Sequence, residues 1–307
     1  MPSQFHQGFI SLFRLRIDLV LRLATLARVP LAETDVTKWR EVSNEFNDPG
    51  GRGAVFHSDF VLAAFDRPPP PDAPPESLIG LPALEALFVE SQFRKDPRKP
   101  RATLVYRAGV RCRHDCPNWG LLVSPDLGVI EWADTRMFER EPELRLRRIG
   151  PDDVDVILDP AVAQIDPGWT ALTAALHARG PHALEAARLA IRAARGLPLE
   201  QRQCYTTLVI EGLENDDMTE LIQQLPADDH DIIPEFVRTS GVFNWGIREG
   251  LEQGRRADLM LLLHERQLDP TEEQRATIEA CTNPERLQRW LLAALRVHSV
   301  AELLATE

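Results

Sequence analysis

Cysteine is scarce in this sequence, which has four cysteines among 307 residues. The N-terminal region lacks the apolar stretch of a secretory leader, because Arg14, Arg16 and Asp18 interrupt it. Few cysteines and no leader favour a reducing compartment, so we expect a cytoplasmic protein. No segment approaches ~18 uninterrupted apolar residues, so we expect no membrane-spanning helix and no membrane partner. The cysteines are Cys112, Cys116, Cys204 and Cys281.

Signatures of several common enzyme classes are also missing. No Gly-rich phosphate loop follows a predicted strand, and no Gly-x-Ser-x-Gly elbow is present. These absences argue against P-loop nucleotide hydrolysis and against an α/β-hydrolase. Cys112, His114 and Cys116 suggest zinc, but a tetrahedral site needs four ligands and no second pair lies nearby in the sequence. We therefore expect Cys112 and Cys116 to be core neighbours on a helix.

Positive charge is concentrated in one segment of an acidic protein. The formal net charge of −12 argues against a general polyanion binder. Residues 94–113 nevertheless carry net +7, which leaves −19 on the rest of the chain. One interpretation is a solvated helix face, and the other is a phosphate-binding surface. For the second interpretation, the candidate nucleic-acid-binding residues are Arg94, Lys95, Arg98, Lys99 and Arg101.

The N-terminal half alternates helix and strand patterns, which predicts an α/β layer. Apolar spacing predicts a long amphipathic helix over residues 4–28, and residues 35–46 fit a short helix or a strand. Six prolines between residues 68 and 75 predict an exposed loop. The predicted strands cover residues 55–65, 84–92, 119–124, 144–149 and 154–158, and helices are predicted at 101–115 and 125–132.

Strand signals end near residue 166, so we expect an α/β domain over residues 1–165 and an all-helical region over 166–307. Gly246, Gly250 and Gly254 are spaced by four, which places them on one face of a helix. Close helix packing, a homodimer contact and a frayed helix all fit this spacing. The other predicted helices cover residues 169–179, 181–195, 198–213, 217–225, 257–267, 271–280 and 284–304.

Two carboxylates stand inside apolar strand patterns, Asp59 in residues 55–65 and Glu90 in residues 84–92. An ionised carboxylate is costly to bury unless it is paired or binds a metal. If the two strands pair, both carboxylates can converge on one Mg²⁺ or Mn²⁺ ion. Gln92 shares the strand face of Glu90 and can orient a water, while Lys99 or Lys95 stabilises a phosphate. The alternative is a strand-end carboxylate neutralised by arginine.

The order Asp59, then Glu90-Ser91-Gln92, resembles the PD-(D/E)XK nuclease superfamily, and more narrowly its recombination-promoting nuclease (Rpn) and putative-transposase branch. In that branch Glu-x-Gln replaces the usual Glu-x-Lys, and the C-terminal glycine pattern is also similar. The resemblance implies a restriction-endonuclease-like mixed sheet flanked by helices.

The same resemblance implies Mg²⁺-dependent DNA cleavage. Asp59 and Glu90 would be metal ligands, Gln92 would take the water-positioning place, and Lys99 would compensate for the missing lysine. An upstream glutamate, Glu41 or Glu45, would join the site. The alternative from another class is a catalytically inactive interaction or scaffold protein that keeps the nuclease fold.

Overall fold

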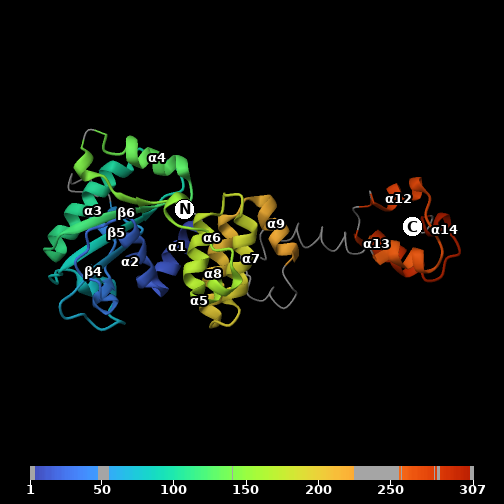
Figure 1. The fold of residues 1–307 in the computed structure, drawn as a ribbon, viewed down its shortest axis with the longest axis horizontal. Helices are drawn as coiled ribbons and strands as arrows, with labels where there is room; N and C mark the ends of the chain where they lie inside the picture. Colours follow the sequence, from blue (N-terminus) through green and yellow to red (C-terminus); the bar gives the residue numbers. More distant parts are fainter. Residues whose placement is uncertain are drawn as a thin grey trace. The chain divides into compact units, whose positions relative to one another are not determined.

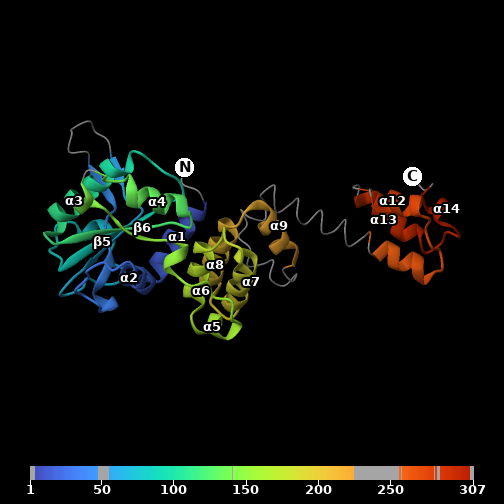
Figure 2. The same ribbon diagram turned by 45° about the horizontal axis from the view of Figure 1, so that its top comes forward.

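The computed structural model of the chain forms two compact units, Met1–Met218 and Thr219–Glu307. It describes residues 4–47, 55–139, 141–224, 256, 258–279, 281 and 284–304. The first unit contains all the described strands, and the described elements of the second unit are helices (Figures 1 and 2). The chain is therefore mixed α/β, as expected, and its described C-terminal part is helical.

A five-stranded mixed sheet lies at the centre of the first unit, in the order β1-β4-β5-β6-β7. Strands β1, β4 and β5 pair antiparallel, whereas β5, β6 and β7 pair parallel. Every residue of β4 and β5 is buried, as expected for apolar strands covered on both faces. Strands β2 and β3 form a separate antiparallel pair. The strands are β1 (Trp39–Glu41), β2 (Glu45–Asn47), β3 (Val55–His57), β4 (Phe60–Ala64), β5 (Glu85–Ser91), β6 (Asn118–Val123) and β7 (Arg147–Ile149).

Helices cover both faces of this sheet (Figure 1). On one face, Phe13 of α1 (Gln4–Leu15) packs against Phe60 of β4, with ring centroids 6.1 Å apart. On the other face, Tyr106 of α3 (Lys99–His114) packs edge-on against Phe88 of β5 at 5.8 Å. Helix α3 connects the parallel strands β5 and β6, and α4 (Leu127–Thr135) lies between β6 and β7 in the chain. The sheet therefore has the layered arrangement that the sequence pattern predicts.

The predicted helix over residues 4–28 is two helices, α1 and α2 (Ile17–Leu26). Arg16 separates them with non-helical dihedral angles of φ −140° and ψ 71°. Its guanidinium donates hydrogen bonds to Asp18 at 2.8 Å and to Asp166 at 3.0 Å. The break therefore lies where one arginine binds two carboxylates, a long-range contact that apolar periodicity does not reveal.

Three further predictions need correction. The segment 55–65 is two strands, because β3 pairs with β2 while β4 pairs with β1 and β5. Residues 154–158 do not form a strand, and the Val154 carbonyl lies 2.7 Å from His177 Nε2 instead. The last predicted helix is two helices, α13 (Pro284–Ala293) and α14 (Val300–Leu304).

The proline-rich segment is a loop, as predicted, and it leads into a short 3₁₀ turn. The 3₁₀ turns are η1 (Val36–Lys38), η2 (Pro75–Leu78), η3 (Pro142–Leu144) and η4 (Pro151–Asp153).

Helix α8 (Leu199–Gly212) packs against α1, the N-terminal helix of the same unit. A Cβ atom added to Gly8 of α1 would lie 3.1 Å from the Leu208 Cα atom of α8, so these helices approach closely. The predicted boundary near residue 165 therefore falls inside the first compact unit. The helices of this layer are α5 (Pro160–Ile165), α6 (Pro167–Leu176), α7 (Ala183–Ala194) and α8 (Leu199–Gly212), and α9 (Asn215–Gln224) follows them in the chain.

The second unit has a hydrophobic core of its own. Trp290 of α13 is 1% exposed, and it packs with Leu259 and Leu263 of the helical residues 258–265 and with Ile278 of α12 (Glu272–Glu279). The glycines predicted to share a helix face, Gly246, Gly250 and Gly254, lie outside the described residues. Within the described parts of the chain, no helix is long and apolar enough to cross a bilayer.

Candidate active site

Asp59 and Glu90 lie opposite each other at one edge of the central sheet. Phe60 pairs with Val89 in the β4–β5 register, and the next position outward sets Asp59 beside Glu90. The Asp59 backbone nitrogen lies 3.4 Å from Glu90 Oε1, and the Ser91 amide donates a 2.6 Å hydrogen bond to Asp59 Oδ2. The structure therefore brings together the two carboxylates that the sequence singles out.

The surroundings of these carboxylates are buried. Glu90 is 1% exposed, and the side chain of Asp59 is 11% exposed. Both lie where the parallel strands β5 and β6 end and where the sheet changes from antiparallel to parallel pairing. The crevice outside the carboxyl ends of parallel strands is the usual ligand position in open α/β sheets.

Lys99 belongs to the same cluster, although it comes from a different element. It is the first residue of α3, which begins shortly after β5 and returns toward the end of that strand. Its ammonium donates a hydrogen bond to Glu90 Oε2, and its side chain is only 18% exposed. A lysine in this position neutralises one of the two carboxylates and is largely withheld from solvent.

Gln92 directly follows β5, and its described side-chain contact is with the backbone of Arg94. It is buried, and its backbone nitrogen donates to the Val123 carbonyl of β6 at 2.9 Å. Its side-chain nitrogen donates to the Arg94 carbonyl. Because that carbonyl only accepts, the amide nitrogen must face it, which leaves Gln92 Oε1 as the side-chain acceptor for a water or an ion.

Burial sets the electrostatics of the cluster. It raises the pKa of Asp59 and of Glu90, and the Asp59 charge raises the Glu90 pKa further, while Lys99 lowers the pKa of both. Burial alone lowers the Lys99 pKa, but Glu90 and Asp59 outweigh it, so the Lys99 pKa is raised. When both carboxylates are ionised they face a single ammonium, and the excess negative charge favours binding of a cation.

The donor set fits a hard divalent ion bound in part by substrate. Within the described ranges, no group of three or more His, Cys, Asp or Glu side chains could hold a metal ion. Mg²⁺, however, is commonly bound by one or two carboxylates together with waters and substrate phosphate oxygens. Asp59 and Glu90 provide such a pair, so the residues present are compatible with Mg²⁺ or Mn²⁺.

His6 also contacts the cluster, and sequence reasoning missed it. It lies on α1, with Nε2 3.4 Å from Asp59 Oδ1 and Nδ1 3.2 Å from the Ser91 carbonyl oxygen. Burial lowers the His6 pKa. The available signal was that His6 is a polar residue among the apolar positions Phe5 and Phe9 on one helix.

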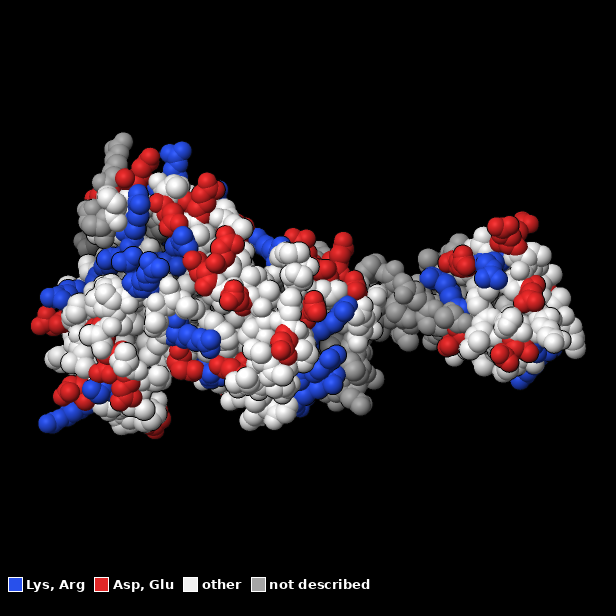
Figure 3. Space-filling model, in the orientation of Figure 1, with Lys and Arg blue, Asp and Glu red and all other residues white. Residues whose placement is uncertain are grey.

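The basic segment does not form one uniform surface. Figure 3 shows Lys and Arg side chains gathered over the part of the first unit that carries α3. Arg94, Lys95 and Arg98 are exposed, although Arg98 also donates to Asp96 at 3.0 Å. The exposed residue Arg101 lies over the ring of Phe56.

Two arginines farther along α3 donate hydrogen bonds to backbone carbonyls of other segments. Arg107 donates to the Leu144 carbonyl at 3.2 Å, and Arg113 donates to the carbonyls of Ser43 and Glu45. The net charge of residues 94–113 therefore overstates the positive charge that is accessible to solvent or to a ligand.

Neither upstream glutamate approaches the cluster. Glu41 of β1 accepts from Arg14 at 2.9 Å, and the exposed side chain of Glu45 lies 3.8 Å from His57 Nδ1. The contribution implied by the family resemblance for Glu41 or Glu45 is therefore not present in this arrangement.

The cysteine pair around His114 does not form a metal site. Cys112 is exposed on α3, while Cys116 is buried beyond the end of that helix. His114 Nδ1 lies 2.9 Å from the Leu81 carbonyl oxygen, and burial raises the Cys116 pKa to about 11. Only Cys116 is thus a core residue, and the expectation for Cys112 is wrong because that face of α3 is open to solvent.

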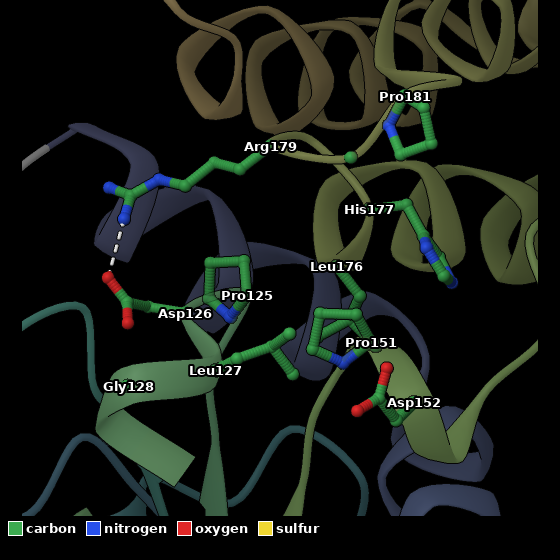
Figure 4. Close-up of a pocket in the computed structure, with 11 residues that line it drawn as sticks. Pro125, Asp126, Leu127, Gly128, Pro151, Asp152, Leu176, His177, Arg179 and Pro181 are labelled. Atoms are coloured by element: carbon green, nitrogen blue, oxygen red, sulfur yellow. Dashed lines mark hydrogen bonds and ion pairs between the residues drawn. The ribbon is translucent and has the colours of Figure 1, made fainter. Parts of the chain in front are cut away.

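A cavity of about 420 Å³ lies along the same sheet edge, where β6 and β7 end (Figure 4). Apolar residues of three loops line it, including Pro125, Pro151 and Pro181. Arg179 and Asp126, which both line the cavity, form a 2.7 Å ion pair. Asp59, Glu90, Gln92 and Lys99 do not line this cavity, which is distinct from the carboxylate cluster.

Comparison of the chain with protein-family models, with curated proteins and with solved structures gave no match.

Proposed function

We propose that this protein is a divalent-metal-dependent DNA endonuclease of the PD-(D/E)XK type, similar to the Rpn branch. The observation that supports the proposal is that Asp59, Glu90 and Lys99 lie together where the sheet changes from antiparallel to parallel pairing. The exposed basic residues Arg94, Lys95 and Arg98 follow the end of the same strand, β5. The mixed sheet with helices on both faces agrees with a restriction-endonuclease-like core.

Asp59 and Glu90 would hold Mg²⁺ or Mn²⁺ in this proposal. When bound, the ion lowers the pKa of a water and neutralises charge that develops on the scissile phosphate. The Lys99 ammonium lowers the Glu90 pKa against the opposing effect of burial, and it also offers positive charge to the phosphate. Gln92 Oε1 accepts a hydrogen from the attacking water and orients it.

DNA would be held through its phosphates. The nucleic-acid-binding residues of the proposal are those that remain exposed near the cluster, because Lys99 is largely buried within it. Contacts of this kind position the duplex and confer no base specificity by themselves. The exposed residues of the proposed DNA-binding surface are Arg94, Lys95, Arg98 and Arg101.

Plasmid cleavage tests the proposal. Wild type should nick supercoiled DNA with Mg²⁺ or Mn²⁺ and lose the activity in EDTA, whereas Asp59→Ala and Glu90→Ala should be inactive with either metal. Glu131→Ala, which removes an exposed carboxylate from α4, is the matched control and should cleave like wild type. Nicking that survives both cluster substitutions would remove the proposal.

The second candidate is a catalytically inactive interaction or scaffold protein with the same fold. One observation favours it: the Lys99 ammonium already occupies Glu90 Oε2, and Gln92 stands where a lysine is usual. Calorimetric titration with Mn²⁺ separates the two, because metal binding without cleavage of any DNA form supports the scaffold. The homodimer through the helical C-terminal region stays a prediction, which light scattering of the full chain tests.

A further inference from the structure

His6 reaches the carboxylate cluster from an element that the sequence does not connect with it. The residue lies in the first turn of α1, on the face that packs toward the end of β5. Its ring makes two contacts there, one with the Ser91 carbonyl oxygen at 3.2 Å and one with Asp59 Oδ1 at 3.4 Å. The side chain is 15% exposed, so these contacts are shielded from solvent.

Aromatic packing fixes the ring relative to the strand end. Phe93, which directly follows Gln92, lies 4.7 Å from Phe5 and 5.8 Å from Phe9 between ring centroids. The His6 ring stands perpendicular to Phe93 at 6.2 Å. Helix α1 is therefore held against the loop after β5 on both sides of His6.

The hydrogen-bond chemistry orients the imidazole. A carbonyl oxygen only accepts, so the Nδ1 atom facing Ser91 carries a hydrogen, and Nε2 is the atom that faces Asp59. Nε2 lies 3.4 Å from Asp59 Oδ1, and this contact is an ion pair when the imidazole is protonated. Asp59 Oδ2 meanwhile accepts from the Ser91 amide at 2.6 Å. Both carboxylate oxygens of Asp59 thus have a fixed neighbour.

Asp59 needs such a support because it lies outside the strand ladder. It occupies the bend between β3 and β4, where its backbone nitrogen lies 3.4 Å from Glu90 Oε1. A carboxylate on a bend has freer side-chain torsions than one on a paired strand. The groups that immobilise a metal-binding carboxylate commonly change metal affinity or activity 10–100-fold.

We propose that His6 is a positioning residue of the active site, which holds Asp59 in the orientation for binding the divalent ion. The inference rests on the proposed nuclease function and deepens it, because it makes α1 part of the catalytic centre. His6 acts through Asp59, so it sets the metal affinity and the rate of cleavage and leaves DNA binding unchanged.

The experiment compares His6→Ala, His6→Gln and the control His57→Ala in the full chain. His57 has a 56% exposed side chain next to the same bend, so its replacement should not affect the cluster. His6→Ala should lower kcat by about 10–100-fold and weaken Mn²⁺ binding several-fold by calorimetry, with KM for DNA unchanged. His6→Gln, whose amide can donate to Asp59, should recover part of both losses, and His57→Ala should behave like wild type.

A metal-independent measurement separates this inference from the proposed function. In metal-free protein labelled with ¹³C-aspartate, the Asp59 carboxyl resonance should shift in His6→Ala and stay in place in His57→Ala. If His6→Ala shifts the Asp59 resonance but the wild-type protein neither binds Mn²⁺ nor cuts DNA, the nuclease proposal fails and the positioning contact still holds. An unshifted resonance, or a folded His6→Ala with wild-type kcat and Mn²⁺ affinity, would overturn the inference.

Discussion

The Lys99 ammonium is hydrogen-bonded to Glu90 Oε2, so the first turn of α3 is tied to the end of β5, the strand that precedes it. The lysine thereby supplies the cluster with positive charge from a helix start, although Gln92 occupies the strand position where the resembled family usually has lysine. Its ammonium offsets the cost of burying the Glu90 carboxylate.

Replacing Lys99 should affect chemistry more than folding. Lys99→Met keeps the apolar stem and removes the ammonium, so the two carboxylates face each other without a compensating charge. We expect cleavage to fall by about 10²–10³-fold, the size seen when one electrostatic stabiliser is removed. Lys99→Arg should retain part of the rate, measured as initial nicking velocity at saturating Mn²⁺. Full activity in Lys99→Met would mean that this ammonium has no role in cleavage.

Cleavage should have an acidic limb nearer neutrality than free carboxylates would give. Burial raises the pKa of Asp59 and Glu90, and both must be ionised to bind the cation. The rate should therefore rise with pH through this raised range and level off above it. Because Lys99 lowers both pKa values, Lys99→Met should move the limb to higher pH. Nicking rates measured from pH 5 to 9 at fixed Mn²⁺ provide the check.

The same carboxylates should destabilise the metal-free protein at high pH. Their pKa is higher folded than unfolded, so the folded state binds protons first and stability rises as pH falls from the raised value toward the ordinary one. Glu90→Gln should therefore raise Tm at pH 8 by about 2–4 °C, the change that ~1 kcal/mol gives in a domain of this size. The gain over wild type should shrink by pH 5. A Tm below that of wild type at pH 8 would show that the Lys99 pair stabilises the fold more than burial costs.

Gly109 should be intolerant of a side chain. A Cβ atom at this position of α3 would lie 2.2 Å from Phe46 Cδ1, in a packed core. We expect Gly109→Ala to destabilise the protein by about 1–3 kcal/mol, as overpacking does. Gly196→Ala is the matched control, because a Cβ atom there meets no atom within 4 Å. Urea titrations of the two variants should differ accordingly, and equal midpoints would contradict the packing of β2 against α3.

Exposed arginines of the basic segment should set the salt dependence of DNA binding. Arg94→Ala removes one exposed charge near the cluster, so the slope of log K against log salt should decrease in magnitude by about 1. Arg192→Ala removes an exposed arginine from α7 and should leave the slope as in wild type. Fluorescence anisotropy between 50 and 300 mM salt measures both. Equal slopes for Arg94→Ala and wild type would exclude Arg94 from phosphate contact.

The sequence predicts the parts of the fold that local patterns encode. The apolar run ending at Glu90 predicts β5, and the pairing of β5 with β4 follows from a second apolar run after Asp59. Charge density near the strand end indicates Lys99 or Lys95, and Lys99 is the one that contacts Glu90. Strand periodicity also predicts that Gln92 shares the face of Glu90, and this stays a prediction because Gln92 lies beyond the end of β5.

The rest depends on contacts between distant residues. The break at Arg16 reflects its bonds to Asp18 and Asp166, which no periodicity records. His6 reaches Asp59 only because the aromatic packing around Phe93 orients α1. Helical spacing also failed to show that α8 joins the sheet-bearing unit, since Gly8 gives no sign of its partner in the sequence.

The close approach of α1 to α8 bears on when this protein becomes complete during translation. The helix that carries His6 is synthesised before α8, yet the surface that Gly8 contacts is present only once Leu208 has been added. A nascent chain that ends before α8 has its strands and the contacts of α1 with the sheet, but it lacks the second surface on which α1 packs. Complete packing of α1 therefore requires translation through residue 208.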